Sequence, residues 1–369
     1  MNGVRLRAII VKELWAILRD PRSRIALLVP PIIQLLIFGF ASTLEVKNIT
    51  LGVLNRDSGY WSQEVIQRVQ GSPNVTGIVV LRSEAEARTA IDRQHVIAVL
   101  RFDSSFSADV TSGKGGEIGT VFDGRRSNAA QIVSGYIDRI AAEISAGVIG
   151  RYISAPSGSS VVMNWFNQNL DYLWFTMPAL IAIVGAVTTL SVVTQSVARE
   201  RELGTFDQLM VSPLRVHEIL IGKMVPPVLI GALVATIYII LIPLIFGVPL
   251  SGTVGLLYLA LIFYLLALTG IGMLVSVLSG TQQQAFLGMF LVTIPAILLS
   301  GYASPIDNMP GWLQIIAWLN PVSYFLRVCE GVFLKAMPAQ EVLANCWPLA
   351  LIAVATLGTA SVLFRSRME

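Results

Sequence analysis

Charged residues are scarce in this chain of 369 residues, where lysine, arginine, aspartate and glutamate together make up 13%. A soluble domain of this size carries roughly 25%. The shortage is concentrated in discrete apolar blocks, and a helix needs roughly 20 apolar residues to cross about 30 Å of hydrocarbon. Six runs reach that length, at residues 25–44, 173–197, 225–247, 254–278, 283–301 and 346–364. The composition therefore predicts a polytopic α-helical membrane protein with six transmembrane helices.

Ionisable side chains are missing from the apolar cores of all six runs. Ion-coupled carriers and proton pumps usually place such groups inside the membrane, so this absence disfavours a secondary carrier. The stretches "SGKGGE" and "IGKMVP" lack the glycine spacing and the following Ser or Thr of a phosphate-binding loop. The sequence also shows no cluster of nucleophile, base and orienting residue. We therefore expect no catalytic residue, no metal site and no bound cofactor, so energy for transport must come from a partner.

Cysteine is nearly absent, since Cys329 and Cys346 are the only two. Two cysteines form neither a zinc-ligand set nor a disulfide framework. Both fall in or near one segment predicted to be external. A bridge between them stays open, although two separate buried thiols are the favoured interpretation.

Positive charge is missing from the short loop 248–253 and sparse in segment 302–344, whereas it gathers before the first run, between the second and third, and after the sixth. Lys and Arg in short loops favour the cytoplasm. Both termini are therefore predicted inside, and residues 45–172 outside as one soluble insert. The bases that set this orientation are Arg5, Arg7, Lys12, Arg19, Arg22, Arg24, Arg199, Arg201, Arg215, Lys223, Arg365 and Arg367.

The external insert is predicted to be an α/β domain, because apolar, β-rich runs alternate in it with stretches of helix formers. The β-rich runs are Ile49–Leu54, Gly77–Leu81, Val96–Phe102 and Ile118–Phe122. A long helix is predicted next, from an apolar stripe at three- and four-residue steps made by Val133, Ile137, Ile140, Ile144 and Val148. Acids and bases nearly balance in the insert, which indicates no nucleic-acid partner.

Residues 1–24 are predicted to carry a cytoplasmic interfacial helix. Arg5, Lys12 and Arg19 recur every seven residues and share one stripe, beside a broad apolar arc. Such a helix lies along the membrane surface with its bases near anionic headgroups. Asp20 suits an N-cap and Pro21 the first helical position, so the first transmembrane helix begins there. The alternative is a basic tail that only sets the topology.

The region after the insert, residues 173–369, is predicted to contain the other five transmembrane helices. Within it, segment 302–344 is too interrupted by proline and glycine to cross the membrane. We expect short external helices there, which lie against the outer leaflet or dip into it.

The stretch "RERELGTFDQLMVSP" begins at the predicted cytoplasmic end of the second span. Gly204 is expected to end that helix, and Thr205 to Gln208 match a capping box that starts a short new one. Ser212-Pro213 starts the next helix. We interpret this bounded element as a docking helix for a partner, and the alternative is a solvated loop. The expected contact residues are Arg199, Glu200, Arg201, Glu202, Gly204, Thr205, Phe206, Asp207, Leu209 and Met210.

This stretch resembles the signature of type-2 ABC permeases, which carry R-E-R-E-x-G-T-x-E-x-L-x-x-x-P at this place. Asp207 stands where the family usually has Glu. "RDPRS" near the N-terminus, the large insert and the order of spans also match. In addition, "VIAVLRFDSSFSADVTSGKGGEIGTVFDG" and "NWFNQNLDYLWFTMPALIAIV" resemble the drug-export branch.

The resemblance implies a bacterial inner-membrane protein in which residues 200–212 form the coupling helix. It also implies a second copy of the permease, or a similar subunit, and two cytoplasmic ABC ATPases that hold the ATP and Mg²⁺. A periplasmic adaptor protein stays open. The chain itself is expected not to be an enzyme.

The function predicted from the sequence is ATP-driven export of hydrophobic or amphipathic compounds, because a path without formal charge suits them better than small ions. One alternative is a mechanotransmitting subunit that relays ATPase motion to the periplasm without moving a solute. Another is a secondary carrier that works without an ATPase.

Overall fold

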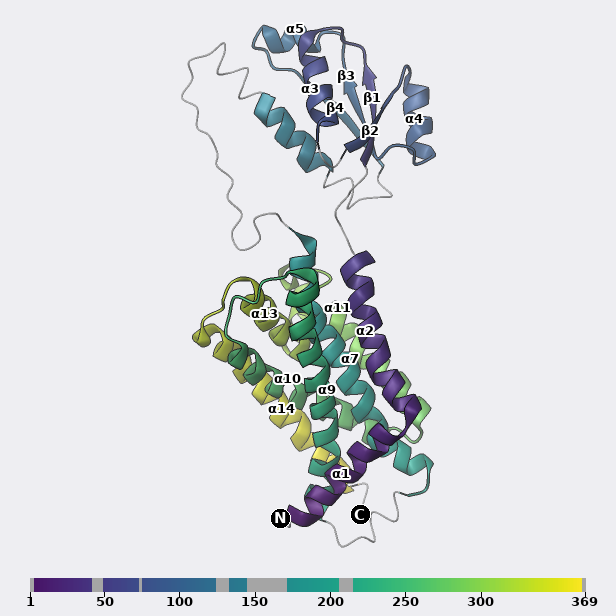
Figure 1. The fold of residues 1–369 in the computed structure, drawn as a ribbon, viewed down its shortest axis with the longest axis vertical. Coiled ribbons are helices and arrows are strands. Elements are labelled where there is room, and N and C mark those ends of the chain that lie inside the picture. Colours follow the sequence, from purple (N-terminus) through teal and green to yellow (C-terminus); the bar gives the residue numbers. More distant parts are fainter. Residues whose placement is uncertain are drawn as a thin grey trace. The chain divides into compact units, whose positions relative to one another are not determined.

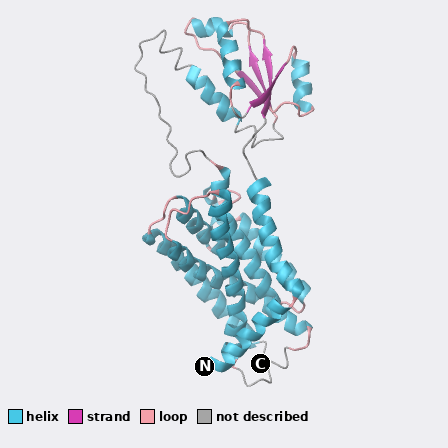
Figure 2. Cartoon of the chain, viewed as in Figure 1, coloured by secondary structure: helices cyan, strands magenta, loops and turns pink. Residues whose placement is uncertain are grey.

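The structure of the protein is a computed structural model that describes residues 3–41, 49–72, 75–123, 133–144, 171–205 and 215–366. The chain divides into two compact units. One combines Met1–Ser42 with Asn164–Glu369, and the other is Thr43–Met163. Figure 1 shows the elements of both units, and Figure 2 marks the helices and strands.

The unit Thr43–Met163 is built on a four-stranded sheet with strand order β2-β1-β3-β4. Strand β1 pairs in parallel with β2 and with β3, while β4 runs antiparallel to β3. The strands are β1 (Ile49–Asn55), β2 (Val75–Val80), β3 (Ala98–Phe102) and β4 (Gly119–Phe122). They lie at the four β-rich runs of the sequence, with bounds that differ by a few residues.

The helices of this unit cover both faces of the sheet (Figure 1). Alternation along β1 explains this, because successive side chains point to opposite faces. Leu51 and Val53 pack with α3 (Tyr60–Gln70) and with the helical residues 133–144. Leu54 packs on the other face with α4 (Glu84–Asp92). A short helix, α5 (Phe106–Thr111), follows β3.

The other unit is helical in the residues that the structure describes. Its elements are α1 (Gly3–Arg19), α2 (Pro21–Ala41), α7 (Tyr172–Glu202), α9 (Val216–Phe246), α10 (Val254–Leu278), α11 (Gln282–Leu298), η2 (Ile306–Asn308), α12 (Gly311–Trp318), α13 (Pro321–Leu334) and α14 (Ala339–Ser366). Helix α2 begins at Pro21, as the sequence predicts, and only Asp20 separates it from α1. Short helices occupy much of segment 302–344.

Four helices in the described part of the chain, α7, α9, α10 and α14, are long and apolar enough to cross a membrane. They correspond to four of the six expected spans. The other two expected spans fall on α2 and α11, whose apolar segments Leu27–Phe40 and Gln282–Leu298 are shorter. Helices α9 and α14 begin at Val216 and Ala339, well before the apolar runs that mark them. Hydropathy locates the apolar part of a helix, and these helices continue through more polar residues.

Helix α7 lies at the centre of this unit and packs against α2, α9, α10, α11 and α13 (Figure 1). The core of the unit around α7 is largely apolar, and two buried tyrosine hydroxyls in it donate hydrogen bonds to backbone carbonyls. Tyr264 of α10 donates to the carbonyl of Ala182 at 2.7 Å, and Tyr238 of α9 donates to that of Pro31 at 2.6 Å. Such bonds hold helices together where no water competes. Cys329 and Cys346 are buried, unlinked thiols, which is the favoured interpretation of the sequence.

Candidate functional site

Helix α7 ends in a hydrogen-bonded motif that fixes where the chain leaves it. Gly204 adopts a left-handed conformation with φ of 69°. Its amide donates to the carbonyl of Arg201 at 3.1 Å, and the amide of Thr205 donates to that of Glu200 at 2.9 Å. This pair of bonds is a Schellman motif, which satisfies the last carbonyls of a helix and favours glycine. The prediction that Gly204 ends this helix is therefore confirmed.

Gly204→Ala should lower the free energy of unfolding by about 1 kcal/mol, because a Cβ is unfavourable at positive φ. The matched control is Gly255→Ala. Gly255 lies in the first turn of α10 with open space around it and no positive φ, so alanine there should be neutral or slightly stabilising. Thermal unfolding of the purified variants checks this. A Gly204→Ala variant as stable as Gly255→Ala would contradict the motif's contribution.

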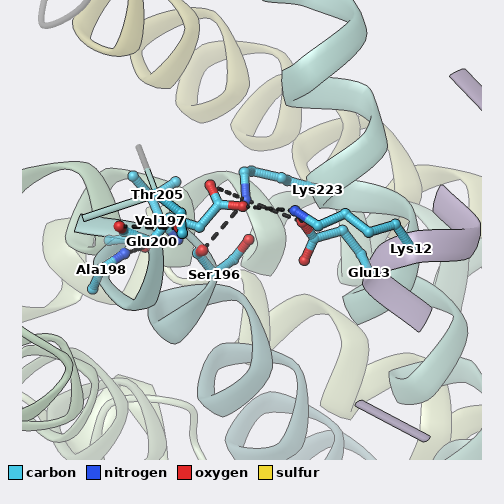
Figure 3. A network of polar contacts seen from close by, with 9 residues as sticks. Lys12, Glu13, Ser196, Val197, Ala198, Glu200, Thr205 and Lys223 are labelled. Atoms are coloured by element: carbon cyan, nitrogen blue, oxygen red, sulfur yellow. Dashed lines mark hydrogen bonds and ion pairs between the residues drawn. The ribbon is translucent and has the colours of Figure 1, made fainter. Parts of the chain in front are cut away.

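Most residues of the charged row Arg199 to Glu202, at this end of α7, have side chains that contact the rest of the chain. The side chain of Glu200 is turned into the protein, and the residue is only 7% exposed. One carboxylate oxygen lies 2.7 Å from Lys223 Nζ of α9, and the other lies 3.1 Å from Lys12 Nζ of α1 (Figure 3). Glu200 therefore links α7 to α9 and to α1, which is distant in the sequence.

Lys223 is the most deeply buried member of this network, at 1% exposure. Besides Glu200, its ammonium contacts Glu13 Oε1 at 3.3 Å and the carbonyl of Ser196 at 3.4 Å (Figure 3). Glu13 also lies 3.3 Å from Lys12. Two cations and two anions thus neutralise one another, which makes their burial tolerable. We call Lys12, Glu13, Glu200 and Lys223 the ion-pair joint.

Lys12 shows the electrostatic effect of this arrangement. Desolvation, the largest single influence, lowers the pKa of Lys12, but the carboxylates of Glu13 and Glu200 together raise it above its ordinary value. The lysine therefore stays charged at physiological pH and the joint keeps its balance of charges.

The next two residues of the row attach α7 to two further helices. Arg201 Nη1 donates to the carbonyls of Val277 and Ser279, at 2.8 and 3.3 Å, at the C-terminal end of α10. Glu202 Oε2 accepts from the amide of Gln282 at 2.7 Å, at the start of α11. A cation at a helix C-terminus and an anion at an N-terminus both complement the helix dipole. Arg199, in contrast, is exposed.

These positions add contacts within the chain to the part that we assign to the row. That its members contact a partner stays a prediction, while the carboxylate of Glu200 binds inside the chain, and Arg201 and Glu202 bind neighbouring helix ends. Thr205 is half-buried, and its hydroxyl donates to the carbonyl of Glu200 at 3.3 Å. Phe206, Asp207, Leu209 and Met210, with the rest of segment 206–214, lie outside the described residues.

Helix α1 is joined to α9 by packing as well as by charge. Ile9 is buried against Gly222, where any Cβ would overlap with it. On the outer face of the helix, the Arg19 guanidinium lies 4.8 Å from the centre of the Trp15 ring, and Trp15 is 52% exposed. Arg5 is exposed too. Lys12 is expected to face lipid headgroups with Arg5 and Arg19, and its ammonium lies 3.1 Å from Glu200 while its side chain stays 58% exposed.

Reasoning from the sequence missed Glu13 and Lys223 as partners of Glu200. A signal was present, because each stands out from the residues of its helix. Glu13 is the only acidic residue of α1, and Lys223 stands between apolar residues in "ILIGKMVPP". Isolated charges of opposite sign on apolar helices tend to be paired when they are buried.

Comparison with known proteins agrees with the family resemblance of the sequence. The profile described as "ABC-2 family transporter protein" matches residues 22–362. The chain is 39% identical over 364 residues to "Probable multidrug ABC transporter permease YbhR" of Escherichia coli, across 99% of both chains. It is 25% identical over 369 residues to "Probable multidrug ABC transporter permease YbhS" of the same species, across 99% of this chain and 98% of the relative.

A further relative in Escherichia coli, "Inner membrane transport permease YhhJ", is 26% identical over 360 residues, across 93% of this chain and 92% of its own. The match to the family profile and to the first of these relatives extends over nearly the whole chain. The chain therefore belongs to the ABC-2 family of transporter proteins, as a membrane permease.

Proposed function

We propose that this permease is the membrane subunit of an ATP-driven exporter for hydrophobic or amphipathic compounds. Two of its relatives are named as multidrug ABC transporter permeases. In this proposal the chain crosses the membrane six times, with residues 45–172 outside, and the four long apolar helices and the two shorter apolar ones support that number. Both termini lie in the cytoplasm of a bacterial cell, and the chain lies in the inner membrane.

The observation that best supports coupling to a partner is the position of the ion-pair joint. It binds the end of α7, directly before segment 206–214, to α1 and α9, while Arg201 and Glu202 bind α10 and α11. A displacement of that segment is therefore transmitted to four other helices at once. Segment 200–212 acts as the coupling element, with Phe206, Leu209 and Met210 as its apolar contacts.

The partners that this function requires are two cytoplasmic ABC ATPases and a second permease, either the same chain or a similar one. ATP and Mg²⁺ bind to the ATPases, and this chain binds no cofactor of its own. A periplasmic adaptor is compatible with the external domain.

Transport in proteoliposomes tests the proposal. The permease is purified with the ATPases that accompany it and reconstituted, and the uptake of a hydrophobic fluorescent dye into proteoliposomes whose ATPases face outward is followed. We expect uptake with ATP and none with a non-hydrolysable analogue. ATP hydrolysis without movement of any hydrophobic dye or lipid would instead indicate a mechanotransmitting subunit, and dye movement without the ATPases would indicate a secondary carrier.

The orientation has its own test, because charge asymmetry predicts it independently of transport. Single cysteines replace Ser112 in the insert, Gly204 after α7 and Ser366 at the end of α14, in a background without Cys329 and Cys346. All three positions are exposed. A membrane-impermeant maleimide added to intact spheroplasts should label position 112 alone. Labelling at 204 or 366 from outside would reverse the topology.

A further inference from the structure

A cavity of about 520 Å³ lies beside the ion-pair joint, between α1, α2, α7 and α9. One part of its wall is apolar and is formed by Ile17, Leu27, Val192, Pro226 and Pro227. Its volume falls within the range of about 300–1,000 Å³ that is typical of small-molecule sites. The cavity therefore has room for a polar headgroup and the upper part of an apolar chain.

The charged part of the wall carries an excess of positive charge. Lys12 and Lys223 line it, but both are neutralised by Glu13 and Glu200 in the ion-pair joint. Arg199 lines it as well, and its side chain forms no ion pair or hydrogen bond with any residue that the structure describes. Among the described residues of the wall, one guanidinium is thus left over to attract an anion, and its planar set of donors suits a phosphate group.

We infer that this cavity binds one anionic glycerophospholipid from the cytoplasmic leaflet, with its phosphate at Arg199 and its acyl chains along Ile17 and Leu27. Two further features favour a membrane lipid over a soluble anion. An apolar wall adjoins the cationic group, which matches an amphipathic ligand. In addition, α1 presents exposed Trp15 and Leu18 beside Arg19, which is the pattern of a helix in the membrane interface.

The bound lipid has a consequence for the ion-pair joint. Lys12 and Glu13 of α1, which line the cavity, are also the residues that hold α1 to α7 and α9. A lipid in the cavity excludes water from these ion pairs and strengthens them, because ion pairs are weaker in a medium of high dielectric constant. The composition of the cytoplasmic leaflet thereby affects how firmly α1 is joined to the other two helices.

Native mass spectrometry of the delipidated permease, titrated with dioleoyl phosphatidylglycerol, tests the site. We expect one saturable lipid per subunit and an about tenfold weaker affinity for Arg199→Gln, the loss typical of one charge-assisted contact. The matched control is Arg7→Gln, an exposed arginine of α1 away from the cavity. Ile17→Trp should weaken binding by filling the cavity, whereas Val11→Trp, at an exposed position of the same helix, should not.

Two other probes show whether the site recognises a whole phospholipid, its acyl chains alone or a soluble phosphate. Dioleoylglycerol has the same chains without phosphate and should bind weakly, and inorganic phosphate should not displace the phospholipid. Equal affinity for Arg199→Gln and the wild type, equal binding of dioleoylglycerol, or full displacement by inorganic phosphate would each overturn the inference. The measurement uses the permease alone, so its failure leaves the proposed transport function untouched, and a failure of transport leaves the lipid site untouched.

Discussion

Glu200→Ala should lower the free energy of unfolding of the permease by about 3–5 kcal/mol, the usual cost of removing one partner from a buried ion pair. The reason is Lys223, which is 1% exposed and, among the described residues, would keep only Glu13, at 3.3 Å, as a charged partner. Lys12 would lose less, because its side chain is 58% exposed and water can replace the carboxylate. The loss in the free energy of unfolding is measured from the shift of the unfolding transition of the purified permease in mixed detergent micelles.

The matched control is an ion pair of the same types on the surface. Lys335 and Glu341 lie 3.2 Å apart with side chains 42% and 53% exposed. Glu341→Ala should therefore cost about 0–1 kcal/mol. If Glu200→Ala and Glu341→Ala lower the free energy of unfolding by the same small amount, the ion-pair joint contributes no more to stability than a surface ion pair.

A double variant separates the ion pair from the cost of an unpaired charge. Glu200→Leu combined with Lys223→Met removes both charges and leaves Lys12 and Glu13 to pair with each other. This double variant should be more stable than either single one, because replacing a buried pair with apolar residues is often neutral or stabilising. A double variant that loses the sum of the two single losses would show that the two side chains do not interact.

Local sequence patterns predicted much of this fold because they depend on near neighbours. The break at Asp20-Pro21 and the end of α7 at Gly204 follow from capping preferences within a few residues. The strands of the α/β unit follow from short β-rich runs. Their order, with β1 between β2 and β3, depends on pairing between distant segments, and the runs alone did not give it.

The direction of each charged side chain could not be predicted in the same way. Glu200 and Arg201 are adjacent in the sequence, but a helix turns by about 100° per residue. Glu200 therefore faces α1 and α9, whereas Arg201 faces α10. The partners of Glu200 lie at positions 12 and 223, and the choice between a solvated carboxylate and a buried one depends on that packing. An alternating pattern of charges carries no information about it.

The second large effect is expected at Phe206, in the proposed coupling segment. Phe206→Asp should abolish stable binding of the ATPases, because a carboxylate without a partner in an apolar socket costs several kcal/mol. Phe206→Leu is the matched control, since it keeps an apolar side chain of similar reach and should retain most of the binding. Neither change alters a helix of the described structure, so both variants should reach the membrane in normal amounts.

Thr205→Ala should have a milder effect, because it removes a single hydroxyl that bonds to the carbonyl of Glu200 at 3.3 Å, a loss of about 1 kcal/mol.

The readouts are co-purification of the ATPases, ATP hydrolysis stimulated by the transported compound, and membrane expression of each permease variant. The graded order expected for coupling is Phe206→Leu nearest to the wild type, then Thr205→Ala, with Phe206→Asp inactive. The ATPases can move the permease only through a contact that persists in every nucleotide state and shifts its position between them. Loss of ATPase binding must therefore abolish transport as well. Normal ATPase binding and full transport by Phe206→Asp would show that the segment after Gly204 is an ordinary loop, and that ATPase motion reaches α7 by another contact.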